Sequence, residues 1–378
     1  MKKRLICTLS FCALAAAGRA AHAAPGEAGG EFLRILQSPR AVAMGESGAG
    51  AYGDLLGALS LNPAALGRNA YKEAAFTYNS WLEGITSQQA AYSQPLGRGV
   101  AAVSVLALSV PSIDGYNNAG LPAGSVEAGD MAGGVSYAAR LAGPYKDKLS
   151  GLFGGGTLKY ASRKLGDASA SAPLLDAGLL WISRSPDATV ALGLSAQSLG
   201  GGFKFDSVTD PAPSVYRLGA SYIILAAGDP ITFSADLKKP SDSGQVLCAG
   251  AEYQVWRTIS VRGGYASGED LGDGLRMGGG VTFKLLQLDY SLSPYGKFGQ
   301  VHRFALSYKF DRRVKNTEHL TFEQEESRVK TGRARALLNE RRYYEAVLEL
   351  NSALALDPGN REAIELMRRA KALLEESR

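Results

Sequence analysis

The feature that most constrains this chain is an alternation of large apolar residues with small or polar ones. In "HRFALSYKF", residues 302–310, one set is Phe304, Leu306, Tyr308 and Phe310, and the other is Arg303, Ala305, Ser307 and Lys309. A period of two places each set on its own face of a β-strand. We count about fourteen such runs between residues 71 and 310, each roughly eight to ten residues long, which is the length a tilted strand needs to cross a bilayer.

The connections between these runs alternate in length. "LGRG" and "VWRT" are short, whereas "PSIDGYNNAGLPAGSVEAG", "SGEDLGDG" and, at 165–173, "LGDASASAP" are predicted to be long or flexible. Outer-membrane barrels have short turns on the periplasmic side and long loops outside. A secreted β-sandwich also alternates, but its outer face would be charged rather than rich in Gly, Ser, Thr and Ala. We therefore predict that residues 71–310 form an all-β transmembrane barrel of about 14 antiparallel strands.

Composition and the N-terminus agree with export to an outer membrane. The chain has 378 residues, 46 of them Gly, and its mean hydropathy of -0.07 is too low for a helical membrane protein. Positive residues at 2–4, an apolar stretch at 5–17 and "AHA" at 21–23 predict a signal peptide over residues 1–23. We expect the outer membrane of a diderm bacterium, with lipid around the barrel and both chain ends on the periplasmic side.

The sequence gives no sign of catalysis. Without the signal peptide the chain has His302, His319 and Cys248, too few for a His/Cys metal site. His302 opens the last predicted strand, where we expect an interfacial polar residue. The G-x-G-x-x-G at 48–53 lacks the strand–helix setting of a dinucleotide site. The net charge of +5 is not gathered into a basic stripe. We predict no enzyme activity, catalytic residue, cofactor, metal or nucleic-acid partner.

A segment before the first strand resembles a known family. "SPRAVAMGESGAGAYGDLLGALSLNPAALG", residues 38–67, is similar to the N-terminal signature of the PorV/PorQ family, whose barrels resemble the FadL long-chain fatty-acid transporters. The resemblance implies that residues 24–70 form a plug inside the barrel, and we expect this segment on the periplasmic side. The residues that carry the plug motif are Arg40, Met44, Gly45, Asn62, Pro63, Ala64 and Leu66.

Within this motif Asn62 and Pro63 allow two interpretations. Proline fixes its own φ and biases the preceding residue away from helix, and an Asn side chain can hold a turn. We favour a turn that ends a short helix and leads into the first strand. Direct contact with a transported ligand is the alternative.

The last strand carries a second motif. Arg303, Ala305, Tyr308 and Phe310 resemble the signal that the barrel-assembly machinery recognises, with Ala305 in place of the usual Gly. This resemblance implies that the machinery is a partner during biogenesis. After Phe310 the chain becomes highly charged, and we predict a linker over 311–326.

The tail resembles a single tetratricopeptide-like repeat. The matching positions are Ala334, Leu337, Ala346, Leu350, Ala353 and Pro358. We predict a small α-helical domain over 327–378, with a third helix at 361–376. One repeat does not usually bury its own apolar face. The tail is therefore either a solvated appendage or, as we favour, a periplasmic module that binds a periplasmic or secreted protein.

These expectations leave three functions open. The resemblance to PorV/PorQ implies export or attachment of secreted proteins, as in a type IX-like system, and the added tail favours this function. The alternative is a FadL-like transporter that takes a hydrophobic small molecule or fatty acid through its lumen. A structural scaffold of the outer membrane is the third.

Overall fold

The computed structural model describes most of the chain. The described residues are 28–51, 53–116, 119–144, 147, 149–185, 188–226, 229–268, 272–310 and 322–376. The predicted signal peptide, residues 1–23, lies outside these ranges, as do residues 311–321 of the predicted linker.

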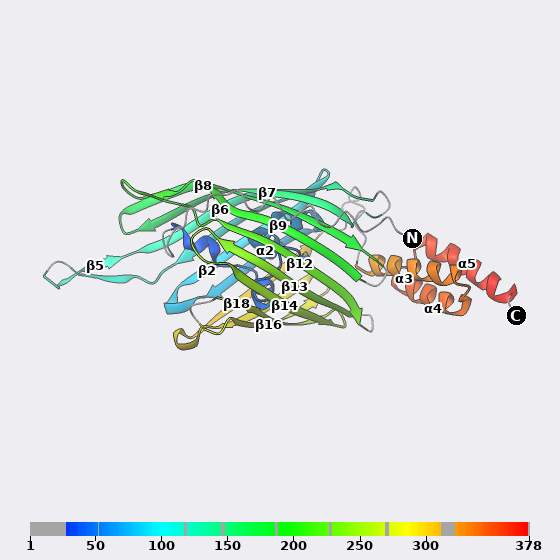
Figure 1. The fold of residues 1–378 in the computed structure, drawn as a ribbon. Helices are drawn as coiled ribbons and strands as arrows, with labels where there is room; N and C mark the ends of the chain where they lie inside the picture. Colours follow the sequence, from blue (N-terminus) through cyan, green and yellow to red (C-terminus); the bar gives the residue numbers. More distant parts are fainter. Residues whose placement is uncertain are drawn as a thin grey trace.

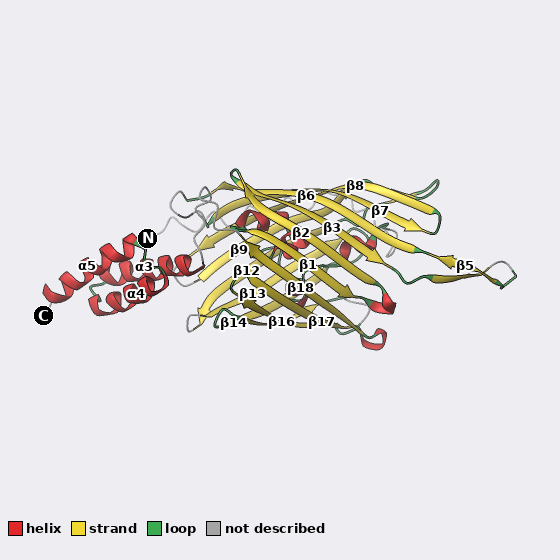
Figure 2. Cartoon of the chain, turned by 180° about the vertical axis from the view of Figure 1, so that it is seen from behind, coloured by secondary structure: helices red, strands yellow, loops and turns green. Residues whose placement is uncertain are grey.

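Within the described ranges, fourteen antiparallel strands form a closed barrel. They are β1 (Lys72–Ser80), β2 (Thr86–Leu96), β3 (Gly99–Ser109), β6 (Ala128–Ala142), β7 (Gly151–Leu165), β8 (Ala168–Arg184), β9 (Ala188–Gly200), β12 (Val215–Ala226), β13 (Asp229–Pro240), β14 (Val246–Val255), β15 (Ile259–Ala266), β16 (Leu275–Phe283), β17 (Leu286–Pro294) and β18 (Gln300–Phe310). The barrel closes where β1 pairs with β18, from Lys72 opposite Phe310 to Ser80 opposite His302 (Figure 2). Closure satisfies the backbone groups of both strands and removes sheet edges. The predicted fold class is confirmed.

The alternation separates a lumen from an apolar outer wall. Phe304 and Tyr308 point outward and are each 48% exposed, whereas Arg303 and Ala305 between them are buried in the interior. Large apolar side chains are exposed in the same way along the other strands. Facing water, so much apolar surface would be unfavourable. The outer wall is therefore suited to lipid.

The two ends of the barrel differ. At the loop end lie the connections that follow β1, β3, β7, β9, β13, β15 and β17. They include the 3-10 turns η3 (Leu82–Gly84) and η4 (Gly296–Phe298) and two hairpins: β4 (Ile113–Tyr116) with β5 (Pro122–Val126), and β10 (Phe203–Lys204) with β11 (Thr209–Asp210). Figure 1 shows β5 projecting well beyond the barrel. The turn end lies opposite and carries the other connections.

One predicted loop is wrong. Residues 165–173 are not a flexible connection, because β7 and β8 continue through them and pair from Leu165 opposite Ala168 onward. Ala170 and Ala172 are buried in this extension, whereas Ser169 and Ser171, which alternate with them, are exposed, as expected of a strand with an inner and an outer face. Ser and Ala are common in loops, and composition alone did not distinguish the two states.

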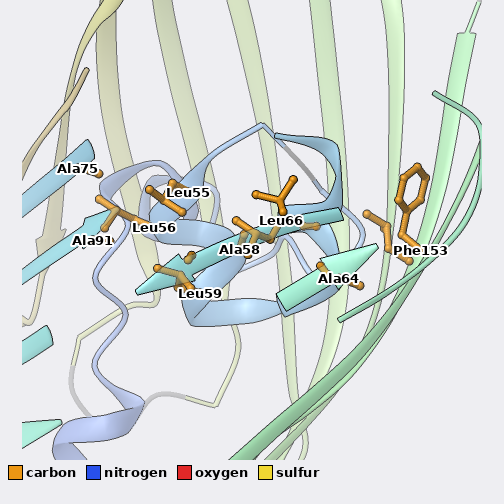
Figure 3. Close-up of a cluster of buried hydrophobic side chains, with 14 of the residues drawn as sticks. Leu55, Leu56, Ala58, Leu59, Ala64, Leu66, Ala75, Ala91 and Phe153 are labelled. Atoms are coloured by element: carbon orange, nitrogen blue, oxygen red, sulfur yellow. The ribbon is translucent and has the colours of Figure 1, made fainter. Parts of the chain in front are cut away.

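The segment before β1 fills the barrel as the plug. It contains η1 (Glu31–Arg34), α1 (Pro39–Ala43), α2 (Leu55–Leu61) and η2 (Pro63–Arg68). The apolar side chains of α2 and η2 pack on wall residues that include Ala75, Ala91 and Phe153 (Figure 3).

We expected the plug to lie on the periplasmic side, but it is not confined to one end of the barrel. Its N-terminal part reaches the loop end, where the Gly29 N–H donates to the Pro211 carbonyl at 2.9 Å. The segment thus runs through the lumen from the loop end to the start of β1 at the turn end.

The tail consists of α3 (Phe322–Asn339), α4 (Tyr343–Leu356) and α5 (Arg361–Glu376), which lie beyond the turn end of the barrel (Figure 1). α3 begins at Phe322, so the last residues of the predicted linker, 322–326, are helical. Among the described residues, no helix combines the length and hydropathy needed to cross a membrane.

Candidate functional site: the plugged lumen

A belt of glycines lets the plug lie directly against the barrel wall. In the described part of the chain, seven wall glycines are placed so that an added Cβ would meet plug atoms: Gly155, Gly178, Gly193, Gly219, Gly250, Gly264 and Gly278. Three cross-strand pairs form within this belt, Gly155 with Gly178, Gly193 with Gly219, and Gly250 with Gly264. Glycine in a strand marks a place where another backbone approaches closely. The wall is therefore shaped for this plug.

Asn62 holds the centre of the plug. Its Oδ1 accepts from the Ala64 N–H at 3.1 Å and caps η2. Its Nδ2 donates to the Ala49 carbonyl at 2.7 Å and to the Leu179 carbonyl of β8 at 3.0 Å. Gly178 leaves room for this fully buried side chain. Pro63 follows as the first residue of η2, and Ala64 and Leu66 are buried in the interface with the wall. These contacts place Asn62 in a structural turn, and its polar atoms are engaged within the protein.

Arg40 begins a chain of ion pairs on the wall. On α1, it pairs with Glu252 of β14 at 2.5 Å. Glu252 also pairs with Arg262 of β15 at 2.7 Å, and Arg262 pairs with Asp289 of β17 at 2.6 Å. Buried charges require such partners, since an unpaired one would be costly.

Met44 and Gly45 lie where the plug backbone crosses β14 and β15. The Met44 carbonyl faces Gly250, and Gly45 lies against Gly264 with a φ of 68°. A side chain at Gly45 would overlap the backbone of Tyr265. The positive φ and the close approach together explain why glycine is needed here.

Asp236 on β13 fastens the next plug segment. Its Oδ2 accepts from the N–H groups of Gly48 and Ala49 at 2.9 and 2.8 Å. Nearby, the hydroxyls of Ser47 in the plug and Ser234 in the wall are in contact. The plug is thus attached to β13 by polar contacts as well as by packing.

A small cavity remains between the plug and the loop end. Its volume is about 50 Å³, which is room for a few water molecules only. The apolar part of its lining includes Leu33, Ile35, Leu106 and Ala132. The cations in its lining are engaged within the protein: Arg34 pairs with Asp242 at 2.7 Å, Lys159 with Asp176 at 2.5 Å and Lys238 with Glu46 at 2.8 Å, and Arg217 donates to the Glu46 carbonyl at 3.0 Å.

Next to this cavity lies a lumenal apolar cluster. Its buried members are Phe32, Leu106, Leu108, Ala132, Ala161, Ala170, Ala172, Leu174, Phe203 and Ala212. Phe32 comes from the plug and Phe203 from the β10–β11 hairpin, while Leu106 and Leu108 come from the wall. A water-filled porin has a polar interior. The loop-end half of this lumen instead contains an apolar cluster formed by the plug, the wall and a hairpin.

The residues of the last-strand motif fall on two faces. Arg303 lies in the lumen, where its guanidinium stands 4.9 Å from the Trp81 ring centre and donates to the Ser293 hydroxyl. Ala305 is also inside, whereas Tyr308 points outward and stacks on Phe310 at 5.8 Å. His302, opposite Ser80, bonds to the Tyr290 hydroxyl through Nδ1 at 2.9 Å.

In the tail, the predicted repeat positions lie between the helices. Ala334, Ala346, Leu350 and Ala353 are fully buried in one cluster, with Leu337 packed against it. Leu338, which the repeat pattern did not single out, is more buried than Leu337. Pro358 lies in the turn between α4 and α5.

Sequence analysis missed the wall residues that hold the plug. The alternation of the sequence places Asp236, Glu252, Arg262 and Asp289 on the non-apolar face of their strands, but it does not identify them as a site. Their charge was the available signal, because an inward-facing charge in a barrel needs a buried partner.

Comparison with known proteins supports the fold. No protein-family model matches the sequence, and no curated protein matches it. Among solved structures, the barrel is similar to the Ralstonia pickettii toluene transporter TbuX, with 14% identity, a TM-score of 0.50, and coverage of 73% of this chain and 100% of that one. A mutant of the TodX monoaromatic hydrocarbon channel matches at 11% identity, TM-score 0.48 and the same coverage. A Pseudomonas aeruginosa FadL homologue matches at 11% identity and TM-score 0.44, covering 73% of this chain and 98% of that one. The chain therefore shares the barrel fold of TbuX.

Proposed function

We propose that this chain is an outer-membrane channel that passes hydrophobic small molecules through its lumen when the plug moves. The observation that carries the proposal is the lumenal apolar cluster, which lies inside the barrel and beside a cavity. Apolar groups such as Phe32 and Phe203 now fill that region. A hydrophobic guest could take their place without exposing the apolar wall to water.

The lumen must change before anything passes. A cavity of about 50 Å³ is too small for an aromatic molecule or an acyl chain. The plug segment carrying Phe32 is held at the loop end by Arg34, which pairs with Asp242 and donates to the Pro213 carbonyl. We propose that displacement of this segment admits the guest, and that a shift of α1 and α2 lets it continue.

This proposal replaces the protein-export function that the sequence analysis favoured. The similar barrel TbuX is a toluene transporter, and the lumenal apolar cluster agrees with cargo of that class. In the proposal the loop end faces outside and the turn end, with the tail, faces the periplasm. Binding of a periplasmic protein to the tail remains a separate proposal and does not depend on the cargo.

Uptake by cells tests the proposal. Outer-membrane-intact cells with and without the chain are given radiolabelled toluene, a radiolabelled long-chain fatty acid and a radiolabelled sugar. We expect the chain to increase uptake of one or both hydrophobic probes and to leave the sugar unchanged. Increased sugar uptake alone would contradict a hydrophobic channel.

A matched pair of variants locates the path. Leu106→Asn places a polar group in both the cavity and the lumenal apolar cluster and should reduce hydrophobic uptake. Ser104→Ala changes a cavity residue on the same strand without adding a polar group, and should not reduce hydrophobic uptake. Equal uptake by the two variants, both folded, would exclude this path.

A further inference from the structure

The tail touches the barrel at the turn end. Glu326 in the first turns of α3 forms an ion pair with Arg257, and its side chain is only 7% exposed. Lys330, one helical turn further on, is 3.8 Å from the same carboxylate. Figure 1 shows α3 next to the barrel and α4 and α5 farther away. The contact is therefore made by one end of one helix.

Arg257 is presented by a rigid part of the rim. It belongs to the tight turn between β14 and β15, in which Trp256 and Arg257 have φ values of 48° and 55°. Two residues with positive φ are typical of a type I′ hairpin turn. The Trp256 N–H also donates to the Asp229 carboxylate at 3.1 Å, which ties this turn to the neighbouring β13. Because the turn is held in place, Arg257 occupies a defined position in which it can pair with Glu326.

A second interaction lies almost opposite on the rim, where the positive charge of Arg328 acts on Asp147 in the β6–β7 connection. Partial burial raises the pKa of Asp147. Hydrogen bonds from Ser150 and Leu149 and the positive charges of Arg184 and Arg328 lower the pKa by more than burial raises it, so the pKa of Asp147 is below its usual value. Arg328 is on α3, two residues from Glu326. The start of α3 is therefore near both turns at once.

The β14–β15 turn and the β6–β7 connection lie on opposite sides of the barrel. In the barrel as described, the two turns are separated by six strands one way around, β14, β13, β12, β9, β8 and β7, and by eight the other way. They therefore face each other across the opening. A helix end that contacts one of these turns and acts through its charge on the other stands in the mouth of the barrel.

We propose that α3 closes the turn-end mouth of the barrel and is held there by a latch, the ion pair between Glu326 and Arg257. In that position α3 blocks the exit of a guest into the space beyond the turn end. This last consequence depends on the proposed function, whereas the latch itself does not. Opening requires that the ion pair break and α3 swing away.

A distance measurement tests the latch without any cargo. In full-length protein carrying Cys248→Ala, spin labels are placed at Arg98→Cys on the β2–β3 turn and at Ser352→Cys on the exposed face of α4, and their separation is measured by electron–electron resonance. We expect a single narrow distance distribution. Glu326→Arg should lose it, and adding Arg257→Glu should restore it by reversing the pair.

The control makes the same charge change elsewhere in the tail. Glu340 pairs with Arg342 within the tail and is exposed, so Glu340→Arg should leave the narrow distribution intact. A broad distribution in the unaltered protein, or one that Glu326→Arg does not change, would overturn the latch.

Uptake tests the closure. Glu326→Arg should increase the rate of hydrophobic uptake, and Glu326→Arg with Arg257→Glu should return it to the original rate. A released tail with an unchanged rate would overturn closure of the mouth. Absence of uptake in every form, the unaltered protein included, would instead contradict the proposed function, and the distance measurement would still decide the latch.

Discussion

Gly193 shows how a single wall residue sets the position of the plug. A Cβ there would overlap the carbonyl of Ala49, so the plug backbone can lie at its observed depth only because no side chain is present. Asp236 acts in the opposite way, by attracting the N–H groups of Gly48 and Ala49. The space left by Gly193 and the hydrogen bonds accepted by Asp236 together determine the position of the plug.

We expect Gly193→Ala to destabilise the plugged barrel by about 1–3 kcal/mol, the usual cost of overpacking. The matched control is Gly263→Ala, since a Cβ at Gly263 meets no other group. Thermal unfolding of the two variants in detergent, followed by gel mobility, measures the difference. Equal midpoints would show that the close approach at Gly193 is not needed.

Asn62→Asp separates the two roles of the side chain. The carboxylate keeps an acceptor for the Ala64 N–H but cannot donate to the carbonyls of Ala49 and Leu179. Each buried group left without its partner costs about 1–3 kcal/mol. We expect faster protease cleavage within the plug while the strands stay intact. Unchanged cleavage would mean that the cap alone holds this turn.

At the scale of elements, the positions of the strands could be predicted from the sequence, whereas the contacts between the plug and the wall could not. The alternation gave the positions of the barrel strands because each wall residue must face either lipid or lumen. It failed at 165–173, where small residues extend β7 and β8. The contacts of the plug could not be predicted, since Arg40 and Glu252 lie far apart in the sequence and meet only after the barrel has closed.

The last strand makes a prediction about assembly. Tyr308 and Phe310 stack on each other near the turn end of β18. We expect that replacing both by Ser lowers the amount of folded barrel in the outer membrane more than it lowers refolding in detergent micelles. A matched decrease in both would indicate a loss of strand stability and not of recognition by the assembly machinery.

The tail should melt independently of the barrel. Leu350 of α4 is fully buried, whereas Leu348 on the same helix is 51% exposed. Leu350→Ala should cost about 2–5 kcal/mol, enough to unfold a small three-helix domain, and Leu348→Ala should have little effect. Circular dichroism at the helical band measures the tail, and gel mobility measures the barrel. Loss of the barrel together with the tail would contradict independent folding.

At the scale of the whole molecule, the chain is a barrel whose lumen holds its own N-terminal segment. The N-terminal part of the plug lies at the loop end, the glycine belt and the ion pairs hold the middle, and in our proposal α3 closes the turn end. In the function that we propose, cargo passes when the plug moves relative to the wall. The central claim is therefore that hydrophobic cargo passes only when the plug is free to move.

Locking the plug to the wall tests this claim most directly. The hydroxyls of Ser47 and Ser234 are in contact, so thiols at these positions are within reach of a disulfide. In cells carrying Ser47→Cys and Ser234→Cys with Cys248→Ala, we predict that oxidation abolishes hydrophobic uptake and that reduction restores it, while each single cysteine variant is unaffected. Uptake at the original rate by the fully oxidised, locked protein would contradict the account.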